Sequence, residues 1–331
     1  MFLPSFLAAM PDPSRFGDVL MAFLSILFEG APYILVGTLL SGFIDAFLPA
    51  RLLERMLPRN RVLSTLMAGF LGLIFPVCEC AVVPVVRRLV QKGLPLSCAM
   101  TYLLSAPIIN PIVVVSTLTA FKEFQKVDGL ASVLDAPMTL GRLSLGYVVA
   151  VIVGLLMLRL RPRQVLRDSV ADAVEQRPTG KEAEGARASF DGRLVHAMRT
   201  AMRDFLDTGM YFTVGVIITS IFNTQVNQSL LDHVAGNDWL AIPSIMALGF
   251  VLSLCSTSDA FIAAPMAVFS NAAKLAFLVF GPMMDVKLVF MYHAVFRRRV
   301  VVILLLGLFL LIGFLSVPWM QLMQALPTWI H

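Results

Sequence analysis

Charged side chains are scarce in this sequence. Asp, Glu, Lys and Arg make up only 14% of the 331 residues, hydrophobic residues make up 58%, and the mean hydropathy is +0.83. A soluble domain of this size could hardly stay in solution with such a composition, so we expect most of the chain to lie in a lipid bilayer. The small net charge of +5 gathers in a few loops. This pattern indicates membrane orientation and argues against nucleic acid as a partner.

Cysteine and histidine are also rare, with four of each. The cysteines are scattered through apolar segments without the spacing of a disulfide framework, so we expect reduced thiols. The sequence has no Walker-A phosphate loop, and it lacks the Gly-x-Ser-x-Gly and His-Glu-x-x-His motifs of common hydrolases. We therefore expect a chain that does not hydrolyse ATP, is not an enzyme and carries no cofactor.

Eight hydrophobic blocks divide the chain into two halves of four. They cover residues 19–48, 62–86, 94–121, 140–158, 205–222, 240–269, 272–296 and 300–317. The segment between the fourth and fifth blocks is rich in Arg, Glu, Asp, Ala and Gly, which is typical of a solvated linker. The expected division is a first transmembrane repeat over 1–160, a cytoplasmic linker over 161–203 and a second transmembrane repeat over 204–331.

The basic residues select between two topologies. Eight simple crossings would place Arg87, Arg88 and Lys92 on the face opposite to the other basic loops, against the positive-inside rule. If blocks 62–86 and 240–269 are re-entrant hairpins, these basic loops and the linker share the cytoplasmic face. Each half then has an odd number of crossings, so the second half is inverted relative to the first.

The expected fold is an all-α polytopic protein of the inner (plasma) membrane. It has two inverted repeats, each of about three transmembrane helices plus a re-entrant helical hairpin, and eight simple transmembrane helices are the alternative. Similar residues recur in the same order in both halves, as an internal duplication predicts. The matches are Glu29, Tyr33 and Gly37 with Asp207, Tyr211 and Gly215, then Cys78 with Cys255, and Pro107 and Asn110 with Pro282 and Asp285.

Prolines and polar residues interrupt the hydrophobic blocks at corresponding places in the two halves. Broken segments of this kind line the central cavity of many secondary transporters, because unwound backbone is tolerated in a bilayer only beside a cavity. We therefore expect the substrate-binding residues to come from these segments. They are Cys78, Glu79, Cys80, Pro84, Ser105, Pro107, Asn110, Cys255, Ser258, Asp259, Pro282 and Asp285.

Three motifs carry a family resemblance. They are Phe-Pro-x-Cys-x-Cys-x-x-x-Pro at 75–84, Ser-Ala-Pro-x-x-Asn-Pro at 105–111 and Cys-Ser-x-x-Asp-Ala-Phe at 255–261. With them the chain resembles, over nearly its whole length except the linker, the predicted-permease family of the ArsP and YraQ type. That family includes an exporter of trivalent organoarsenicals and permeases of unknown cargo. The resemblance implies a permease and leaves the substrate open.

Cys78 and Cys80 are the candidate ligands for a soft metal or metalloid. In an α-helix, residues two apart point about 200° away from each other, whereas in an unwound tip they face the same way. Pro84 favours unwinding because it cannot donate a hydrogen bond to the carbonyl of Cys80. A thiolate pair would suit a trivalent arsenical, Cu(I) or Zn(II). The alternative is that both cysteines are small apolar packing residues.

Three carboxylates are expected near the membrane midplane: Glu79, Asp259 and Asp285. Each costs about 2.5–3.5 kcal/mol there unless it faces a cavity, a partner or an ion path. They are therefore candidates for proton coupling, together with Glu29 and Asp207. Asp285 is favoured because it occupies the position of Asn110 in the other repeat. The alternative for Asp285 is a structural ion pair, for which Lys287 is the nearby cation.

The expected function is that of a secondary transporter. We expect efflux of a soft metal or metalloid species such as a trivalent (organo)arsenical, with proton coupling as one mode of energisation. A permease for another small solute or anion is the alternative, followed by an intramembrane enzyme or an assembly subunit. The expected partners are the lipid bilayer, the cargo and, as one option, a second copy of the chain.

Overall fold

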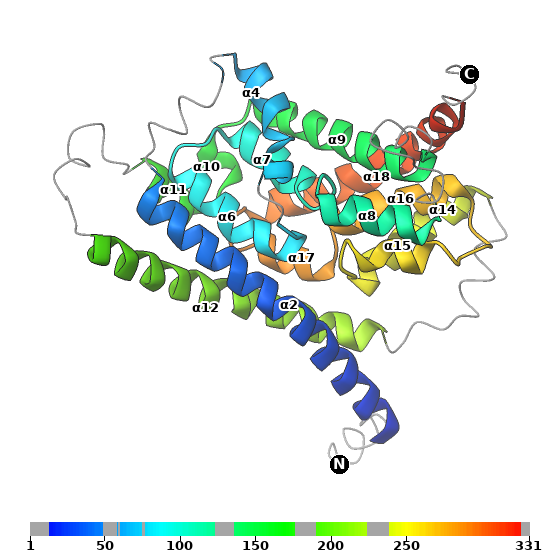
Figure 1. Cartoon of the computed structure of the whole chain (residues 1–331), viewed down its shortest axis with the longest axis horizontal. Helices are drawn as coiled ribbons and strands as arrows, with labels where there is room; N and C mark the ends of the chain where they lie inside the picture. The colour runs from blue at the N-terminus through cyan, green and yellow to red at the C-terminus, as the bar shows by residue number, and fades with distance from the viewer. Residues whose placement is uncertain are drawn as a thin grey trace, which may run out of the picture.

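The computed structural model describes residues 13–48, 58, 60–74, 77–122, 136–175, 190–223 and 238–325. These residues form α-helices and their connections, and the only strand-like pairing among them is an isolated bridge between Leu166 and Phe296. The all-α prediction is confirmed (Figure 1). Phe75 and Pro76 of the first motif lie outside the described residues.

Two of the four hydrophobic blocks of the first half are divided into shorter helices. The block 62–86 is divided between helices, and the block 94–121 breaks at residues 106–110. The second break precedes Pro111, because proline disfavours helical geometry in the residue before it. In order, the helices are α2 (Pro13–Phe47), α4 (Arg61–Ala68), α5 (Leu71–Ile74), α6 (Glu79–Gln91), α7 (Leu96–Ser105), α8 (Pro111–Ala120) and α9 (Pro137–Met157).

The second half repeats this pattern of long and broken helices. Its breaks fall at residues 253–257 and 284–285. The connecting helices are α10 (Pro162–Val165) and α11 (Asp168–Glu175). They are followed by α12 (Phe190–Asn223), α14 (Asp238–Leu252), α15 (Ser258–Ala263), α16 (Asn271–Met283), α17 (Val286–Tyr292) and α18 (Arg298–Ala325).

Five helical stretches in the described residues are long and apolar enough to cross a membrane. They are Phe16–Phe47, Pro137–Met157, Phe190–Phe222, Asn271–Tyr292 and Arg298–Ala325. Other apolar helices, such as α7 and α8, have 10 residues each. At 1.5 Å per residue, such a helix covers about half of a 30 Å hydrocarbon core. The chain is therefore a multi-pass membrane protein that also contains half-length helices.

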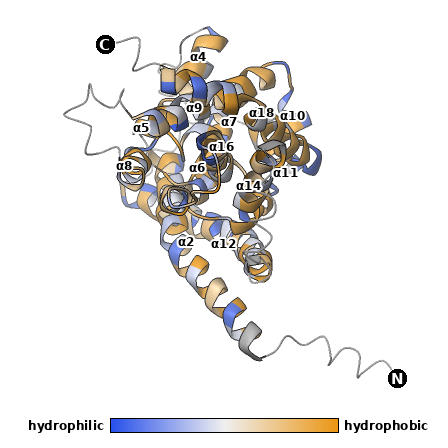
Figure 2. Ribbon diagram, turned by 90° about the vertical axis from the view of Figure 1, so that its right-hand side faces the viewer, coloured by the Kyte–Doolittle hydropathy of each residue, from blue (hydrophilic) through white to orange (hydrophobic). Residues whose placement is uncertain are grey.

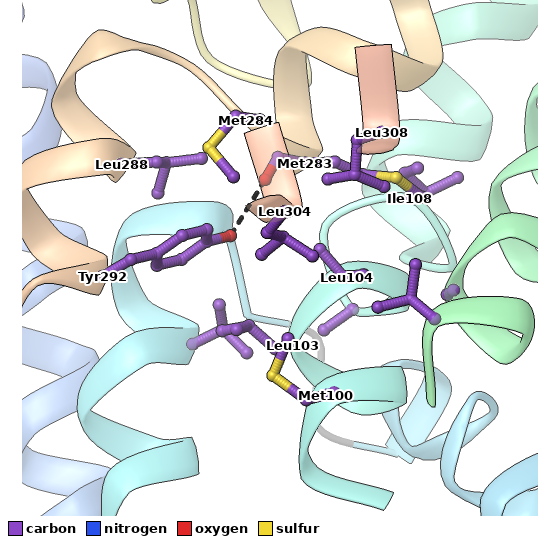
Figure 3. Packing of buried hydrophobic residues seen from close by; sticks show 14 of the residues in the cluster. Met100, Leu103, Leu104, Ile108, Met283, Met284, Leu288, Tyr292, Leu304 and Leu308 are labelled. Carbon is purple, nitrogen blue, oxygen red and sulfur yellow. Dashed lines mark hydrogen bonds between the residues drawn. The ribbon is translucent and has the colours of Figure 1, made fainter. Parts of the chain in front are cut away.

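The surface and the interior of the bundle are both apolar. Large side chains point outward, including Phe28 at 74% and Phe314 at 81% exposure, and Figure 2 shows hydrophobic residues along the outer helices. An apolar surface of this extent is expected where lipid is the solvent. Inside, Met100, Leu103 and Leu104 of α7 pack with Met283 and with Leu304 and Leu308 of α18 (Figure 3). The two halves therefore share one core.

The first part of the predicted linker is packed against the bundle. Val165, Leu166, Val170 and Ala171 are buried. The backbone of Arg297 donates to the carbonyl of Val165 at 3.0 Å. Helix α12 begins at Phe190, within the range 161–203 assigned to the linker. The linker is therefore not solvated throughout, because its apolar residues find a surface on which to pack.

Candidate functional site

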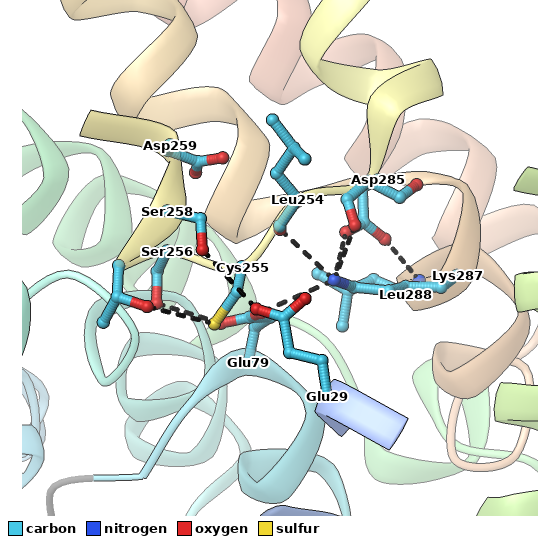
Figure 4. A network of polar contacts seen from close by, with 12 residues as sticks. Glu29, Glu79, Leu254, Cys255, Ser256, Ser258, Asp259, Asp285, Lys287 and Leu288 are labelled. Atoms are coloured by element: carbon cyan, nitrogen blue, oxygen red, sulfur yellow. Dashed lines mark hydrogen bonds and ion pairs between the residues drawn. The ribbon is translucent and has the colours of Figure 1, made fainter. Parts of the chain in front are cut away.

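The breaks that precede α6 and α15 meet in the interior of the bundle. Cys78 is the N-cap of α6, with an extended backbone, and Glu79 opens the helix. Ser256 lies in the break before α15, and its hydroxyl donates a hydrogen bond of 3.0 Å to the Glu79 carboxylate. Figure 4 shows this contact between residues that are 177 positions apart in the sequence. The broken segments of the two halves are therefore one site.

Lys287 lies at the centre of this site and is 3% exposed. Its Nζ is 3.5 Å from Glu79 Oε1 and 3.4 Å from Asp285 Oδ2. It also donates to the carbonyls of Ser253 at 2.8 Å and Leu254 at 3.2 Å, which the break in the helix leaves free. The sequence indicated the pair with Asp285 but not the pair with Glu79. Lys287 of α17 thus contacts both the start of α6 and the break before α15.

Asp285 has a second role as the N-cap of α17. Its Oδ1 accepts a 2.7 Å hydrogen bond from the backbone of Leu288, which satisfies a free N–H group of the first turn. Asn110 caps α8 in the same way, accepting from the backbone of Ile112 at 3.0 Å. The matched positions of the two halves therefore have the same structural role, and only Asp285 adds a charge.

Asp259 faces a cation that the sequence analysis did not single out, Arg142 of α9. Arg142 Nη2 is 4.0 Å from Asp259 Oδ2 and donates to the carbonyl of Ser256 at 2.8 Å. Its Nη1 donates to the Thr117 hydroxyl at 2.9 Å. A buried arginine in the apolar block 140–158 is costly without such partners. Its presence there was therefore the sequence signal that Arg142 has a buried acidic or polar partner.

The buried charges of this cluster do not cancel. Glu79, Asp259 and Asp285 are at most 2% exposed, and the two cations, Lys287 and Arg142, are at most 3% exposed. Three carboxylates and two cations leave a net charge of −1 when all are ionised. Asp259 Oδ2 and Asp285 Oδ2 are buried without a hydrogen bond. Because an unbalanced buried charge is costly, the cluster is suited to accept a proton or a cation.

A small cavity adjoins this cluster, and three of the four cysteines line it. Cys78 and Cys80 lie at the start of α6 and Cys255 lies in the break before α15; Cys98 lies elsewhere, buried in α7. Within the described ranges, no group of three or more His, Cys, Asp or Glu side chains is arranged to hold a metal ion. The remaining lining residues are Ile26, Glu29, Gly30, Tyr33, Glu79, Phe212, Ser253 and Lys287.

The other expected site residues have different surroundings. Ser258 donates a 3.5 Å hydrogen bond to Glu29 beside the cavity. Asp207 does not line the cavity; it pairs with Arg87 at 3.3 Å. Pro84 lies inside α6 and its carbonyl accepts from Ser41. Four further expected residues lie in helix ends and turns and do not line the cavity: Ser105, Pro107, Asn110 and Pro282.

A bundle of apolar helices around a buried charged cluster, with broken helices from both halves meeting beside a cavity, has the architecture of a membrane permease. A family described as predicted permease, ArsP_1, matches residues 15–318. The chain belongs to this family.

Two relatives match over most of their lengths. The "UPF0718 protein YcgR" of Bacillus subtilis (strain 168) is 35% identical over 302 residues, which cover 89% of this chain and 95% of the relative. The "Putative two-component membrane permease complex subunit" of Streptococcus mutans serotype c is 33% identical over 288 residues, or 87% and 90% of the two chains. No solved structure matches this chain.

Replacing Arg142 with methionine is expected to destabilise the fold by about 3–5 kcal/mol. The substitution keeps the apolar stem but leaves the Asp259 carboxylate buried without its cation. Thermal unfolding of the detergent-purified protein measures the loss. Combining it with Asp259→Asn should recover most of the stability, because both charges are then absent. A single Arg142→Met variant as stable as the wild type would show that this pair does not stabilise the fold.

Proposed function

We propose that this permease is a secondary transporter that exports a soft metal or metalloid species, with trivalent (organo)arsenicals as the first candidates. The observation that carries the proposal is the shared cavity of Cys78, Cys80 and Cys255. Soft cargo prefers thiolate ligands, and these three thiols come from both hairpins. A cargo held between them would contact both halves of the protein at once.

The thiols favour a transported cargo over a resident metal ion. They share a cavity without forming a ready coordination set in the described part of the chain. A site of this kind has to close around its cargo and open again, as a transporter requires. The alternative cargo, a small anion, is less favoured because the nearby cations Lys287 and Arg142 are already outnumbered by three carboxylates.

Proton coupling is the proposed source of energy. The cluster of three buried carboxylates and two buried cations carries one excess negative charge, so one bound proton would balance it. Thiol ligands must lose protons to bind a soft cargo, which links cargo binding to proton release. Asp285 and Asp259 are the proposed coupling residues, because each has a buried carboxylate oxygen that accepts no hydrogen bond and faces its cation at 3.4 Å and 4.0 Å, respectively. Glu79 is the third candidate, since it contacts both Ser256 and Lys287.

The membrane orientation belongs to the same proposal. Arg88 and Lys92 lie at the end of α6, which packs against α11, and Arg297 contacts Leu166, so these basic residues share one face with the described first part of the linker. By the positive-inside rule this face is cytoplasmic and the membrane is the plasma membrane. The two halves are then inverted repeats, with hairpins entering from opposite faces; the first repeat ends near residue 160 and the second begins with α12 at Phe190.

A tolerance panel in a sensitised host tests the proposed cargo. Cells with and without the protein are exposed to arsenite, methylated trivalent arsenicals, Cu, Zn and oxyanions. We expect protection against one or more of the thiophilic species and none against the oxyanions, because only the former bind thiolates strongly. Protection confined to oxyanions, or absent throughout with the protein present in the membrane, would contradict the proposed cargo class.

A further inference from the structure

Helices α2 and α12 pack together and, as a pair, pack mainly against the broken helices α6 and α17, with a smaller contact between α12 and α14. We call them the helix pair. Helix α2 packs along α6 and α12 packs along α17. We call the end of the molecule at which α6 and α17 finish, beside α11, the linker face. Helices α8 and α15 extend toward the opposite face, and in the described residues the helix pair makes no extended contact with either of them. Figures 1 and 2 show the start of α2 standing away from the bundle.

Two glycines allow the helix pair to lie this close. A Cβ atom on Gly37 would be 2.7 Å from Ala81 Cα, and one on Gly215 would be 2.7 Å from Lys287 Cα. Any side chain at either position would force the helices apart. These two glycines are the ones that match between the halves in the sequence. Their role in the structure is close approach of the helix pair to α6 and α17.

Buried polar contacts hold the helix pair at the linker face. Arg88 of α6 binds both oxygens of Asp204 on α12, at 2.7 and 2.8 Å, and Asp204 is 1% exposed. Ser41 of α2 donates to the same carboxylate at 2.8 Å. Bidentate arginine–carboxylate pairs of this kind are among the strongest polar contacts in proteins. Further ion pairs join Arg87 to Asp207, and Lys92 and His196 to Asp45.

The matching contact toward the opposite face is much weaker. Glu29 of α2 corresponds to Asp207 of α12, and α15 corresponds to α6. Yet in the part of the chain that the structure describes, Glu29 makes one side-chain hydrogen bond, of 3.5 Å, to Ser258 of α15. The apolar residues Ile112 of α8 and Phe261 of α15 are 61% and 53% exposed, whereas Val82 of α6 is fully buried. The repeat makes the surface of α6 and α17 equivalent to the surface of α15 and α8. The helix pair covers the first surface and leaves the second uncovered.

We infer that this structure is one of two transport conformations, closed at the linker face and open at the opposite face, and that Arg88 and Asp204 are its gate. In the second conformation the helix pair leaves α6 and α17 and packs on α8 and α15. The repeat register then places Gly37 beside Ile112 and Gly215 beside Ser258. The inference rests on the proposed transporter function. It adds that the contacts of the helix pair with α6 and α17 break, and that contacts with α8 and α15 form, when the protein changes conformation.

The native cysteines of the cavity report which face is open. The protein is reconstituted in vesicles, and its orientation is read from an epitope tag inserted in the linker at Lys181. A membrane-impermeant maleimide is added to one side, and the labelling of Cys78 and Cys255 is measured by mass spectrometry. We expect labelling from the face opposite the tag and little from the tagged face. Equal labelling from both faces, or labelling from the tagged face only, would overturn the inference.

Loosening the gate should reverse the labelled side. With Arg88→Gln and Asp204→Asn combined, no buried charge is left unpaired, and labelling from the tagged face should rise at least about tenfold, since charge-assisted bonds are lost. The matched control combines Arg163→Gln and Asp172→Asn, which removes an ion pair in which both side chains are more than half exposed. A gate variant that labels like this control would contradict the assigned gate.

A second variant keeps the test decisive if the gate variant does not fold. Combining Arg87→Gln with Asp207→Asn removes the neighbouring ion pair between α6 and α12 and should also move labelling to the tagged face, whereas the exposed Arg163/Asp172 control should change nothing. Folded protein with the Arg87→Gln and Asp207→Asn pair and wild-type labelling would contradict the inference. The assay needs no cargo. A failed arsenical assay with the expected labelling would therefore refute the cargo and leave the gate in place.

Discussion

Replacing Cys78, Cys80 or Cys255 with serine is expected to abolish protection against a thiophilic cargo. Each substitution removes one of the three sulfurs that line the cavity while changing the side-chain volume little. Serine is a hard ligand that does not replace a thiolate for soft cargo. Tolerance should fall to that of cells without the protein, and membrane abundance, measured by immunoblot, should stay unchanged.

Cys98→Ser is the matched control for this series. Cys98 is fully buried in α7 and does not line the cavity, so transport should be nearly unaffected. A Cys78/Cys80 double variant with full activity would reduce both residues to packing roles. Loss of activity in Cys98→Ser together with full activity in Cys255→Ser would instead place the cargo in another part of the chain.

Asp285→Asn is expected to abolish uphill, proton-driven transport while leaving folding and cargo binding intact. Asparagine can still cap α17, because its side-chain oxygen can accept the hydrogen bond from Leu288. The substitution removes the negative charge beside Lys287 and makes the position equivalent to Asn110. The cluster then no longer carries the excess charge that a proton would balance. Flux in proteoliposomes with an imposed pH gradient measures the effect.

Two comparisons make the Asp285→Asn result specific. Asp172→Asn removes an exposed carboxylate of α11 and should leave uphill flux unchanged. Asp259→Asn tests the second proposed coupling residue, which faces Arg142. Uphill flux that survives in Asp285→Asn would exclude this residue as the coupling site. A wild-type flux that does not respond to the pH gradient would exclude proton coupling for the whole cluster.

The sequence predicted the broken helices because their causes are local. Proline removes a backbone donor and disfavours helical geometry before it, so the interruption near Pro111 could be read from the residues alone. Asn110 and Asp285 are strong N-cap residues, and both do cap the helices that follow them. The composition predicted an all-α membrane protein for a similar reason, since lipid excludes unpaired backbone.

The contacts between distant segments could not be read from local signals. An ion pair of Lys287 with Asp285, two residues away, was the alternative that the sequence offered, but the contact of Lys287 with Glu79 requires segments far apart in the sequence to meet. Cys255 joins Cys78 and Cys80 at the cavity for the same reason. Arg142 was missed because its partners come from other helices. Its position in an apolar block was informative, but it did not identify Asp259 as the partner.

The central claim is that soft cargo crosses the membrane through the cavity lined by Cys78, Cys80 and Cys255. The most direct measurement is cargo flux in proteoliposomes that contain the purified protein, with a methylated trivalent arsenical as the tested species. We expect flux above that of protein-free vesicles, which the Cys78→Ser variant lacks and the Cys98→Ser variant keeps. Flux that is equal in the wild type, the Cys78→Ser variant and protein-free vesicles would contradict it.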